Sequence, residues 1–196
     1  MRQRELDLMP GPRLASNFSI SRSTRYQLID WMTELHQICR LEENSLFLAV
    51  NLLDRILATR SMYTDDLPLL ATAAITLAAK YDGVRGHMVS VKRMAKHLSN
   101  EFLPVEIYSA ELFVLEALGY ELGWPTPFDL LYQICRGIEC DSGCIAFAEC
   151  IIRTSLKNDH LVRIPSSSIA SAALYLSFKS HSQDWVRPRV FYVGYS

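Results

Sequence analysis

The sequence predicts an all-α fold that contains two similar helical bundles in tandem. Residues 70–80 (LATAAITLAAK) recur in altered form as residues 169–179 (IASAALYLSFK), with five of the eleven positions identical. An internal repeat of this kind indicates duplicated structural units. Each copy is apolar on nearly every side, which is typical of a helix at the centre of a bundle. The chain has only 8 glycines and 8 prolines, which argues against a loop-rich β fold.

The composition limits the classes of partner. A hydrophobic content of 49% in 196 residues allows a real core and argues against disorder. The net charge is −1, with 20 basic and 21 acidic residues spread along the chain, so there is no electrostatic sign of nucleic-acid binding. The N-terminus has no signal-peptide core, and the longest apolar stretch, residues 67–79, is too short to cross a bilayer. We expect a soluble intracellular protein without nucleic-acid or membrane partners.

The five cysteines favour a structural role over a metal site. Four of them lie between Cys135 and Cys150, at spacings that match no zinc pattern, and no C-x2-C pair occurs. We expect reduced thiols, no metal and no other cofactor.

Five helices are predicted in the first half of the chain, after an extended lead-in over residues 1–20. Apolar residues three and four positions apart predict the first, with Ser21, Ser23 or Thr24 as its N-cap. The second helix begins near Asn44, and the third is the repeated helix, capped by Asp65 or Asp66. A short basic helix over residues 90–98 comes next. The fifth helix runs from Pro104 to a stop at Gly119 and carries Tyr108, Leu112, Leu115 and Leu118.

The second half is predicted to be shorter. The run from Trp124 to Pro127 breaks the helical pattern and resembles a linker. Three helices follow, over residues 128–136, 142–157 and 166–179, the last capped by Ser166. The aromatic tail, residues 180–196, has no clear period.

No catalytic signature is present, because the chain lacks a glycine-rich phosphate loop, an H-E-x-x-H motif and a G-x-S-x-G motif. Charges within apolar helices are more informative. Arg25 and Asp54 either pair with each other or both face water, and the residues alone leave this open. Lys80 ends the repeated helix, and Glu111 shares a helix flank with Tyr108. Taken alone, a lysine with a solvated head and a solvent-facing glutamate are the favoured interpretation.

At these positions the sequence resembles the cyclin family. Arg25 followed by YQLIDW, FLAVNLLDR at 47–55, AAKYD at 78–82, and Glu111 followed by LGYEL at 118–122 resemble blocks of the cyclin box. Residues 125–127 resemble the boundary between the two boxes, and residues 2–10 resemble mitotic B-type cyclins. The resemblance implies a lead-in over residues 1–20, a first five-helix box over 21–123 and an incomplete second box over 124–196.

The resemblance also implies a function. Cyclins bind and activate a cyclin-dependent protein kinase by pushing its movable helix inward, which completes a Lys–Glu ion pair and orders the activation segment. Lys80 and Glu111 would be the central polar contacts to that helix, and Arg25 and Asp54 a structural ion pair. Apolar contacts would come from Tyr81, Leu115, Tyr120 and Leu122. We expect control of cell-cycle progression at G2/M, a location in the nucleus and cytoplasm, and no enzymatic activity of the chain itself.

The family's substrate-docking patch is only partly kept. Leu28 and Trp31 match it, whereas Thr24 and Gln27 replace apolar residues and Pro68 replaces glutamine. Docking of kinase substrates or inhibitors at this patch is therefore left open.

Two alternatives belong to other functional classes. One is a cyclin-fold transcription factor that contacts DNA, against which the net charge of −1 counts. The other is a cyclin-like scaffold that activates no kinase. Because the second box resembles an incomplete one, we expect the first box to be the stable unit, with helix 166–179 only partly covered by the tail.

Overall fold

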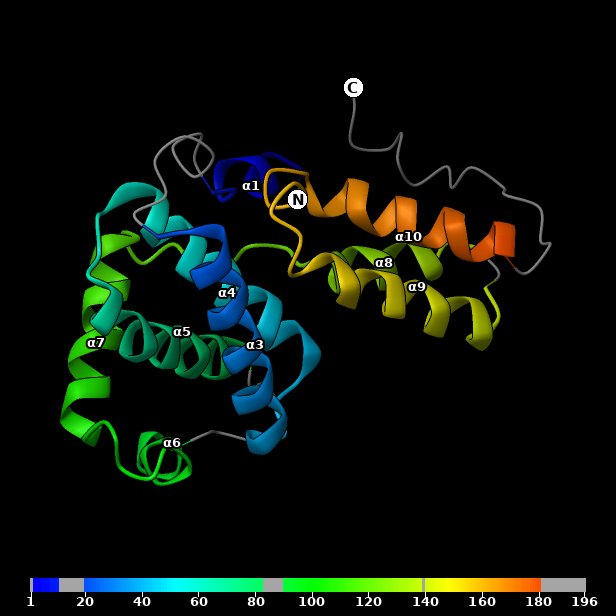
Figure 1. The fold of residues 1–196 in the computed structure, drawn as a ribbon. Helices are drawn as coiled ribbons and strands as arrows, with labels where there is room; N and C mark the ends of the chain where they lie inside the picture. The colour runs from blue at the N-terminus through cyan, green and yellow to red at the C-terminus, as the bar shows by residue number, and fades with distance from the viewer. Residues whose placement is uncertain (1, 11–19, 83–89, 139, 181–196) are drawn as a thin grey trace. The chain divides into compact units, whose positions relative to one another are not determined.

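The computed structural model describes residues 2–10, 20–82, 90–138 and 140–180, and all regular secondary structure in these ranges is helical (Figure 1). This confirms the predicted all-α fold. The chain forms two compact units, one of residues 10–124 and one of residues 1–9 with 125–196. The domain limits predicted from the sequence stay a prediction.

The first unit is built around one central helix. Its elements are α3 (Arg22–Cys39), α4 (Glu43–Thr59), the 3₁₀ turn η1 (Thr64–Asp66), α5 (Leu67–Asp82), α6 (Val91–His97) and α7 (Pro104–Ala117). Helix α5 packs against α3, α4, α6 and α7 (Figure 1), and each of its residues 70–79 is at most 6% exposed. The hydroxyls of Thr72 and Thr76 donate to carbonyls one turn back, at 2.8 and 3.1 Å, so even the polar groups of this helix are satisfied inside it.

Helix ends in this unit follow the local sequence. Ser21 caps α3, because its side chain accepts from the backbone N–H of Thr24 at 3.0 Å. Helix α7 ends in a Schellman motif, in which the N–H of Tyr120 bonds to the carbonyl of Leu115 at 2.8 Å. Gly119, with φ of +60°, supplies the left-handed residue that this motif needs.

The N-terminal segment differs from its prediction. Residues 2–7 form the helix α1 (Arg2–Asp7) rather than an extended lead-in, and this helix belongs to the second unit. Glu5 is 2% exposed and accepts from the N–H of Ser167 at 2.6 Å, at the start of α10 (Ser166–Ser180). Because α10 begins at Ser166, this serine is the first helical residue and not the predicted N-cap. A distant carboxylate satisfies part of the helix N-terminus instead.

The second unit also contains α8 (Pro127–Cys135) and α9 (Ser142–Ser155), and both pack against α10. Thr126 and Asp129 form a capping box at the start of α8. Helix α10 carries the second copy of the repeat, yet only one side of it is buried. Tyr175 is 42% exposed and Leu176 is 48% exposed. The tail that we expected to cover α10 lies, from residue 181, outside the described residues.

We predict that backbone amides in the middle of α5 exchange with deuterium at least about tenfold more slowly than those in the middle of α10, since α5 is enclosed on all sides. Hydrogen exchange followed by mass spectrometry measures both helices in one sample. Comparable protection of the two helices would show that α10 is covered as well as α5 in solution.

Candidate functional site

A fully buried ion pair joins α3 to α4. The guanidinium of Arg25 donates to both carboxylate oxygens of Asp54, from Nε at 2.9 Å and from Nη2 at 2.7 Å. The two side chains are 1% and 4% exposed. The alternative that both face water is therefore wrong, and the bidentate geometry fixes the angle at which α3 meets α4.

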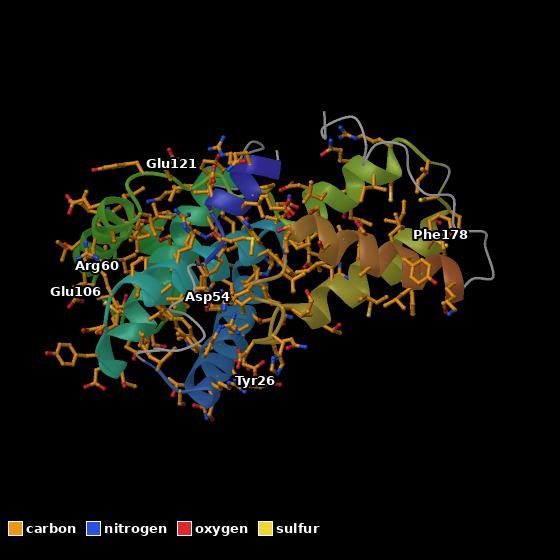
Figure 2. The ribbon with its side chains drawn as sticks, turned by 90° about the horizontal axis from the view of Figure 1, so that it is seen from above. Tyr26, Asp54, Arg60, Glu106, Glu121 and Phe178 are labelled. Atoms are coloured by element: carbon orange, nitrogen blue, oxygen red, sulfur yellow. The ribbon has the colours of Figure 1, made fainter. Side chains whose placement is uncertain are left out.

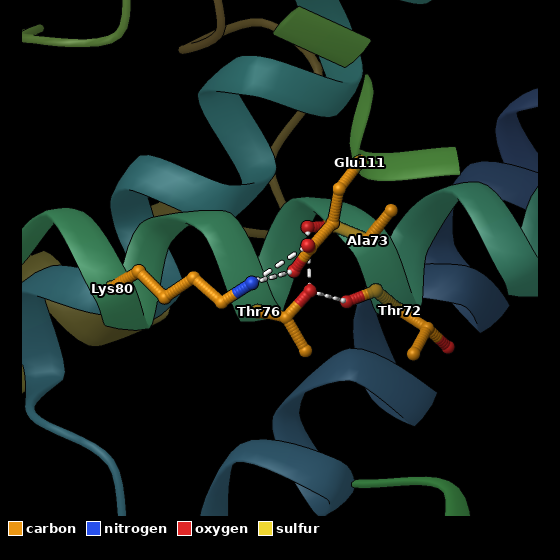
Figure 3. A network of polar contacts seen from close by, with 5 residues as sticks. All are labelled: Thr72, Ala73, Thr76, Lys80 and Glu111. Atoms are coloured by element: carbon orange, nitrogen blue, oxygen red, sulfur yellow. Dashed lines mark hydrogen bonds and ion pairs between the residues drawn. The ribbon is translucent and has the colours of Figure 1, made fainter. Parts of the chain in front are cut away.

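A second ion pair joins the end of α5 to the middle of α7 (Figure 3). The ammonium of Lys80 donates to both carboxylate oxygens of Glu111, at 2.7 and 2.6 Å. The Lys80 side chain is 32% exposed, and that of Glu111 is 7% exposed. The ring of Tyr108 lies 5.5 Å from the Lys80 nitrogen, within reach of a cation–π interaction. The interpretation of Glu111 as a solvent-facing residue is therefore wrong.

Exposed apolar side chains lie near this second pair in sequence and in structure. Tyr81 follows Lys80 and is 49% exposed, while Tyr108 and Leu112 lie within one helical turn of Glu111 and are about half exposed. The ordered ion pair and the exposed apolar side chains around it are together the candidate site of this unit. The sequence pattern did not separate Leu112 from Leu118, which is in the core at 9% exposure.

The other predicted contact residues lie at or after the end of α7. Leu115 is within α7 and is partly buried. Tyr120 follows Gly119 just past the end of α7, where the Schellman motif holds its backbone, and its side chain is 64% exposed. Leu122 is partly buried. Arg55 anchors this segment, because its Nη1 donates to the carbonyl of Glu121 at 2.7 Å. Burial lowers the pKa of Arg55, and the charge of Glu121 opposes that shift. Sequence reasoning missed this role, although Arg55 belongs to the LLDR block.

The predicted docking patch has one buried member. Leu28 is 7% exposed and belongs to the core, and Gln27 is exposed. Thr24, Trp31 and Pro68 are partly buried, and the Thr24 hydroxyl bonds to that of Ser21 at 2.8 Å. Docking of substrates or inhibitors here stays a prediction of the resemblance.

Three cysteines of the second unit, Cys135, Cys140 and Cys144, are partly or fully buried, whereas Cys150 is exposed. Burial, with a contribution from a hydrogen bond to Cys140, raises the pKa of Cys135 to about 12. Burial also raises the pKa of Cys140 and of Cys144. In the described ranges, no three His, Cys, Asp or Glu residues are grouped so that they could hold a metal ion. In the same ranges, no helix has the length and apolarity that a bilayer span requires.

We predict that Asp54→Ala lowers the free energy of unfolding by about 3 kcal/mol, because it leaves the Arg25 charge buried without its partner. Urea denaturation followed by circular dichroism measures the change. Glu34→Ala removes an exposed carboxylate from α3 and is the matched control, with an expected change close to zero. Equal stability of the two variants would rule out a structural role for the pair.

We also predict that iodoacetamide at pH 8 modifies the exposed Cys150 first and leaves Cys135 largely unmodified. With a pKa of about 12, the Cys135 thiol is ionised in only about one molecule in ten thousand at pH 8. The thiolate is the form that reacts with iodoacetamide. Mass spectrometry of the digested protein locates the label, and labelling in urea is the control for accessibility. Equal rates at both positions in the native protein would contradict the buried environment of Cys135.

Comparison with known proteins identifies relatives over the whole chain. G2/mitotic-specific cyclin cig1 of Schizosaccharomyces pombe is 31% identical over 100% of this chain and 47% of the relative's length. G2/mitotic-specific cyclin-B of Emericella nidulans is 30% identical over 100% of this chain and 41% of the relative. The chain thus spans less than half the length of these relatives. The names confirm the predicted resemblance to mitotic cyclins.

Solved structures show the same fold. A viral cyclin from herpesvirus saimiri superposes with a TM-score of 0.79 at 20% identity, covering 98% of this chain and 85% of the viral one. A chain of the yeast RNA Pol II CTD kinase CTDK-1 complex superposes with a TM-score of 0.70 at 17% identity, covering 97% and 64%. The sequence model described as "Cyclin, N-terminal domain" matches residues 1–123, well over half of the chain. The chain therefore belongs to the cyclin family.

Proposed function

We propose that this chain is a regulatory subunit that binds and activates a cyclin-dependent serine/threonine protein kinase and thereby promotes cell-cycle progression at G2/M. Membership of the cyclin family and the G2/mitotic-specific names of its relatives support the proposal. In this proposal the chain supplies no catalytic group itself and acts in the nucleus and cytoplasm.

The observation that carries the proposal is the Lys80–Glu111 pair at the edge of an exposed apolar surface. Two N–H groups of the Lys80 ammonium are directed at a carboxylate that is almost fully buried, at 2.6 and 2.7 Å. A lysine has three such donors, so one N–H is left for a partner's acceptor. Because Glu111 already fixes the ammonium, a partner gains a charge-assisted hydrogen bond without ordering the lysine side chain.

The two residues of the pair therefore have different roles in the proposal. Lys80 contacts the movable kinase helix. Glu111 is a positioning residue, because its buried carboxylate accepts hydrogen bonds from the Lys80 ammonium and so keeps that ammonium in place. Apolar contact comes from Tyr81, Tyr120 and the α7 flank, with Leu115 and Leu122 supporting it from partly buried positions. The hydrogen bond from Arg55 to the carbonyl of Glu121 keeps the segment after α7 in place for this contact.

In this proposal, the contacts offered to the kinase are of the size that activation requires. Moving a kinase from 1% to 99% active requires a preference of about 5.5 kcal/mol for the active state. Burying the exposed half of an aromatic or leucine side chain contributes about 1 kcal/mol, and Tyr81, Tyr108, Leu112 and Tyr120 are all about half exposed or more. A charge-assisted hydrogen bond from Lys80 adds about 1.5–3 kcal/mol. The sum is of the required size if these contacts form only with the active helix position.

We predict that Lys80→Ala combined with Glu111→Ala weakens kinase binding by at least about tenfold, since the polar contact at the centre of the interface is lost. The partner is the kinase recovered by pull-down from an extract of the source cells, and isothermal titration calorimetry measures its affinity. Lys179→Ala is the matched control, because Lys179 occupies the equivalent position of the repeat and is exposed. The Lys179→Ala variant should bind the kinase with unchanged affinity.

Circular dichroism checks that the double variant is folded, and Tyr120→Ser tests the same surface from an exposed position without removing a buried charge. Unchanged affinity of both variants would place the kinase contact elsewhere. Recovery of no kinase at all would overturn the proposed function and favour a scaffold or a DNA-binding role.

A further inference from the structure

Helix α6 has one strongly basic face. Lys92, Arg93, Lys96 and His97 are all exposed, and one helical turn separates Lys92 from Lys96 and Arg93 from His97. The other three residues of α6 are apolar, at most 1% exposed, and packed inward. The helix contains no acidic residue and lies at the edge of the first unit (Figure 1). We call the four exposed residues the basic face.

A further cation comes from the end of α3. The Cys39 thiol donates to the sulfur of Met94 at 3.7 Å, so the last turn of α3 contacts α6. Burial raises the pKa of Cys39, and the positive charge of Arg93 opposes that shift, which shows that Arg93 lies within electrostatic reach of this contact. Arg40 follows Cys39 as the exposed C-cap of α3. Two elements therefore bring positive charge to the same end of the unit.

The charges of the basic face are not neutralised by the described residues. None of its cations is in an ion pair with a described carboxylate. Glu101 is exposed and lies beyond the end of α6. Glu106 lies on the same side of the first unit as Arg60 (Figure 2), and one of its carboxylate oxygens accepts from the N–H of Leu103 at 2.6 Å. The basic face therefore has a positive potential that attracts anions.

The position of two of these cations works against the helix itself. Lys92 and Arg93 occupy the first turn of α6, where the positive end of the helix dipole disfavours cations. The N-cap residue Ser90 forms no capping hydrogen bond through its side chain. Residues that break a local rule of helix stability are expected at functional surfaces. Binding of an anionic partner gives these two cations a role that helix formation does not.

Two kinds of anionic partner fit the basic face poorly. A membrane-binding helix inserts apolar side chains beside its cations, but the apolar side chains of α6 are all buried in the unit. A nucleic acid needs an extended row of cations, and this face spans about 8 Å along α6. The whole chain has a net charge of −1, so the charge outside this surface is negative and repels a long polyanion.

We propose that the basic face binds an acidic linear segment of a partner protein, with aspartate or glutamate at alternate positions. Alternate residues of an extended chain point to the same side and are about 7 Å apart, close to the rise of about 6 Å between Lys92 and Lys96. The cations lie on an exposed helix surface, so several separate carboxylates match them better than one phosphate group does. The face shares no residue with the Lys80–Glu111 site and does not depend on the function proposed above.

The test uses the full ¹⁵N-labelled chain and three probe peptides: GSESESESGS, its glutamine analogue GSQSQSQSGS, and the glutamine analogue with one phosphoserine. Titration followed by NMR reports both the affinity and the residues that respond. We expect the glutamate peptide to shift resonances of residues 90–98 and to bind at least about fivefold more tightly than either other peptide. Added salt should weaken this binding. Equal affinities, tighter binding of the phosphoserine peptide, no binding, or shifts confined to other residues would overturn the proposal.

Variants separate the basic face from general charge attraction. Lys92→Glu combined with Arg93→Glu should weaken the glutamate peptide by at least about fivefold. These changes place carboxylates where the helix dipole favours them, so the variant should fold at least as stably as the unchanged chain, which thermal melting checks. Arg163→Glu combined with Lys179→Glu makes the same change of net charge at exposed positions of the second unit and should leave the affinity unchanged.

Two outcomes of these experiments would assign the charge another meaning. Equal weakening by both double variants would show non-specific attraction. Broadening of the resonances of residues 90–98 on raising the protein concentration without peptide would assign the basic face to a second copy of the chain. Either outcome would overturn the proposal.

Discussion

The enclosure of α5 is the constraint on which the first unit depends. Ten consecutive residues of this helix are almost fully buried, and alanines among them let the neighbouring helices approach closely. Because α3, α4, α6 and α7 all pack on α5, the middle of α5 is covered, and only residues near its two ends reach the surface. At the C-terminal end Lys80 leaves the core beside Glu111, and at the N-terminal end Leu69 and Leu70 line an apolar groove against α7.

The two ion pairs of this unit have different uses because their exposure differs. Arg25 and Asp54 are buried on both sides, so their hydrogen bonds are directed inward and set the geometry of α3 against α4. Such a pair contributes little net stability, but removing one partner is costly. Lys80 keeps about a third of its side chain exposed while Glu111 does not. The Lys80 ammonium is therefore held in place by Glu111 and is still accessible, which suits recognition of a partner protein.

The repeat shows how context changes the role of one sequence pattern. Lys80 and Lys179 end equivalent helices, but Lys80 meets Glu111 from α7, and Lys179 pairs with no described residue. In α10 the Ser177 hydroxyl donates to the carbonyl of Cys144 at 2.6 Å, which joins α10 to α9. Neighbouring helices, and not the repeated residues, decide which copy carries a surface ion pair.

The sequence by itself determined the local features: the all-α class, the central position of the repeated helix in the first unit, the cap at Ser21 and the stop at Gly119. These depend on residues within one or two helical turns, where periodicity and backbone preference act directly. Only the tertiary structure decided that Arg25 meets Asp54, 29 positions away, that Glu111 is buried under Lys80, 31 positions away, and that Glu5 caps a helix 162 positions further on. It also decided that Tyr108 and Leu112 face solvent while Leu118 faces the core. A charged or apolar residue gains its role from the groups packed against it, and local sequence does not specify those groups when they come from a distant part of the chain.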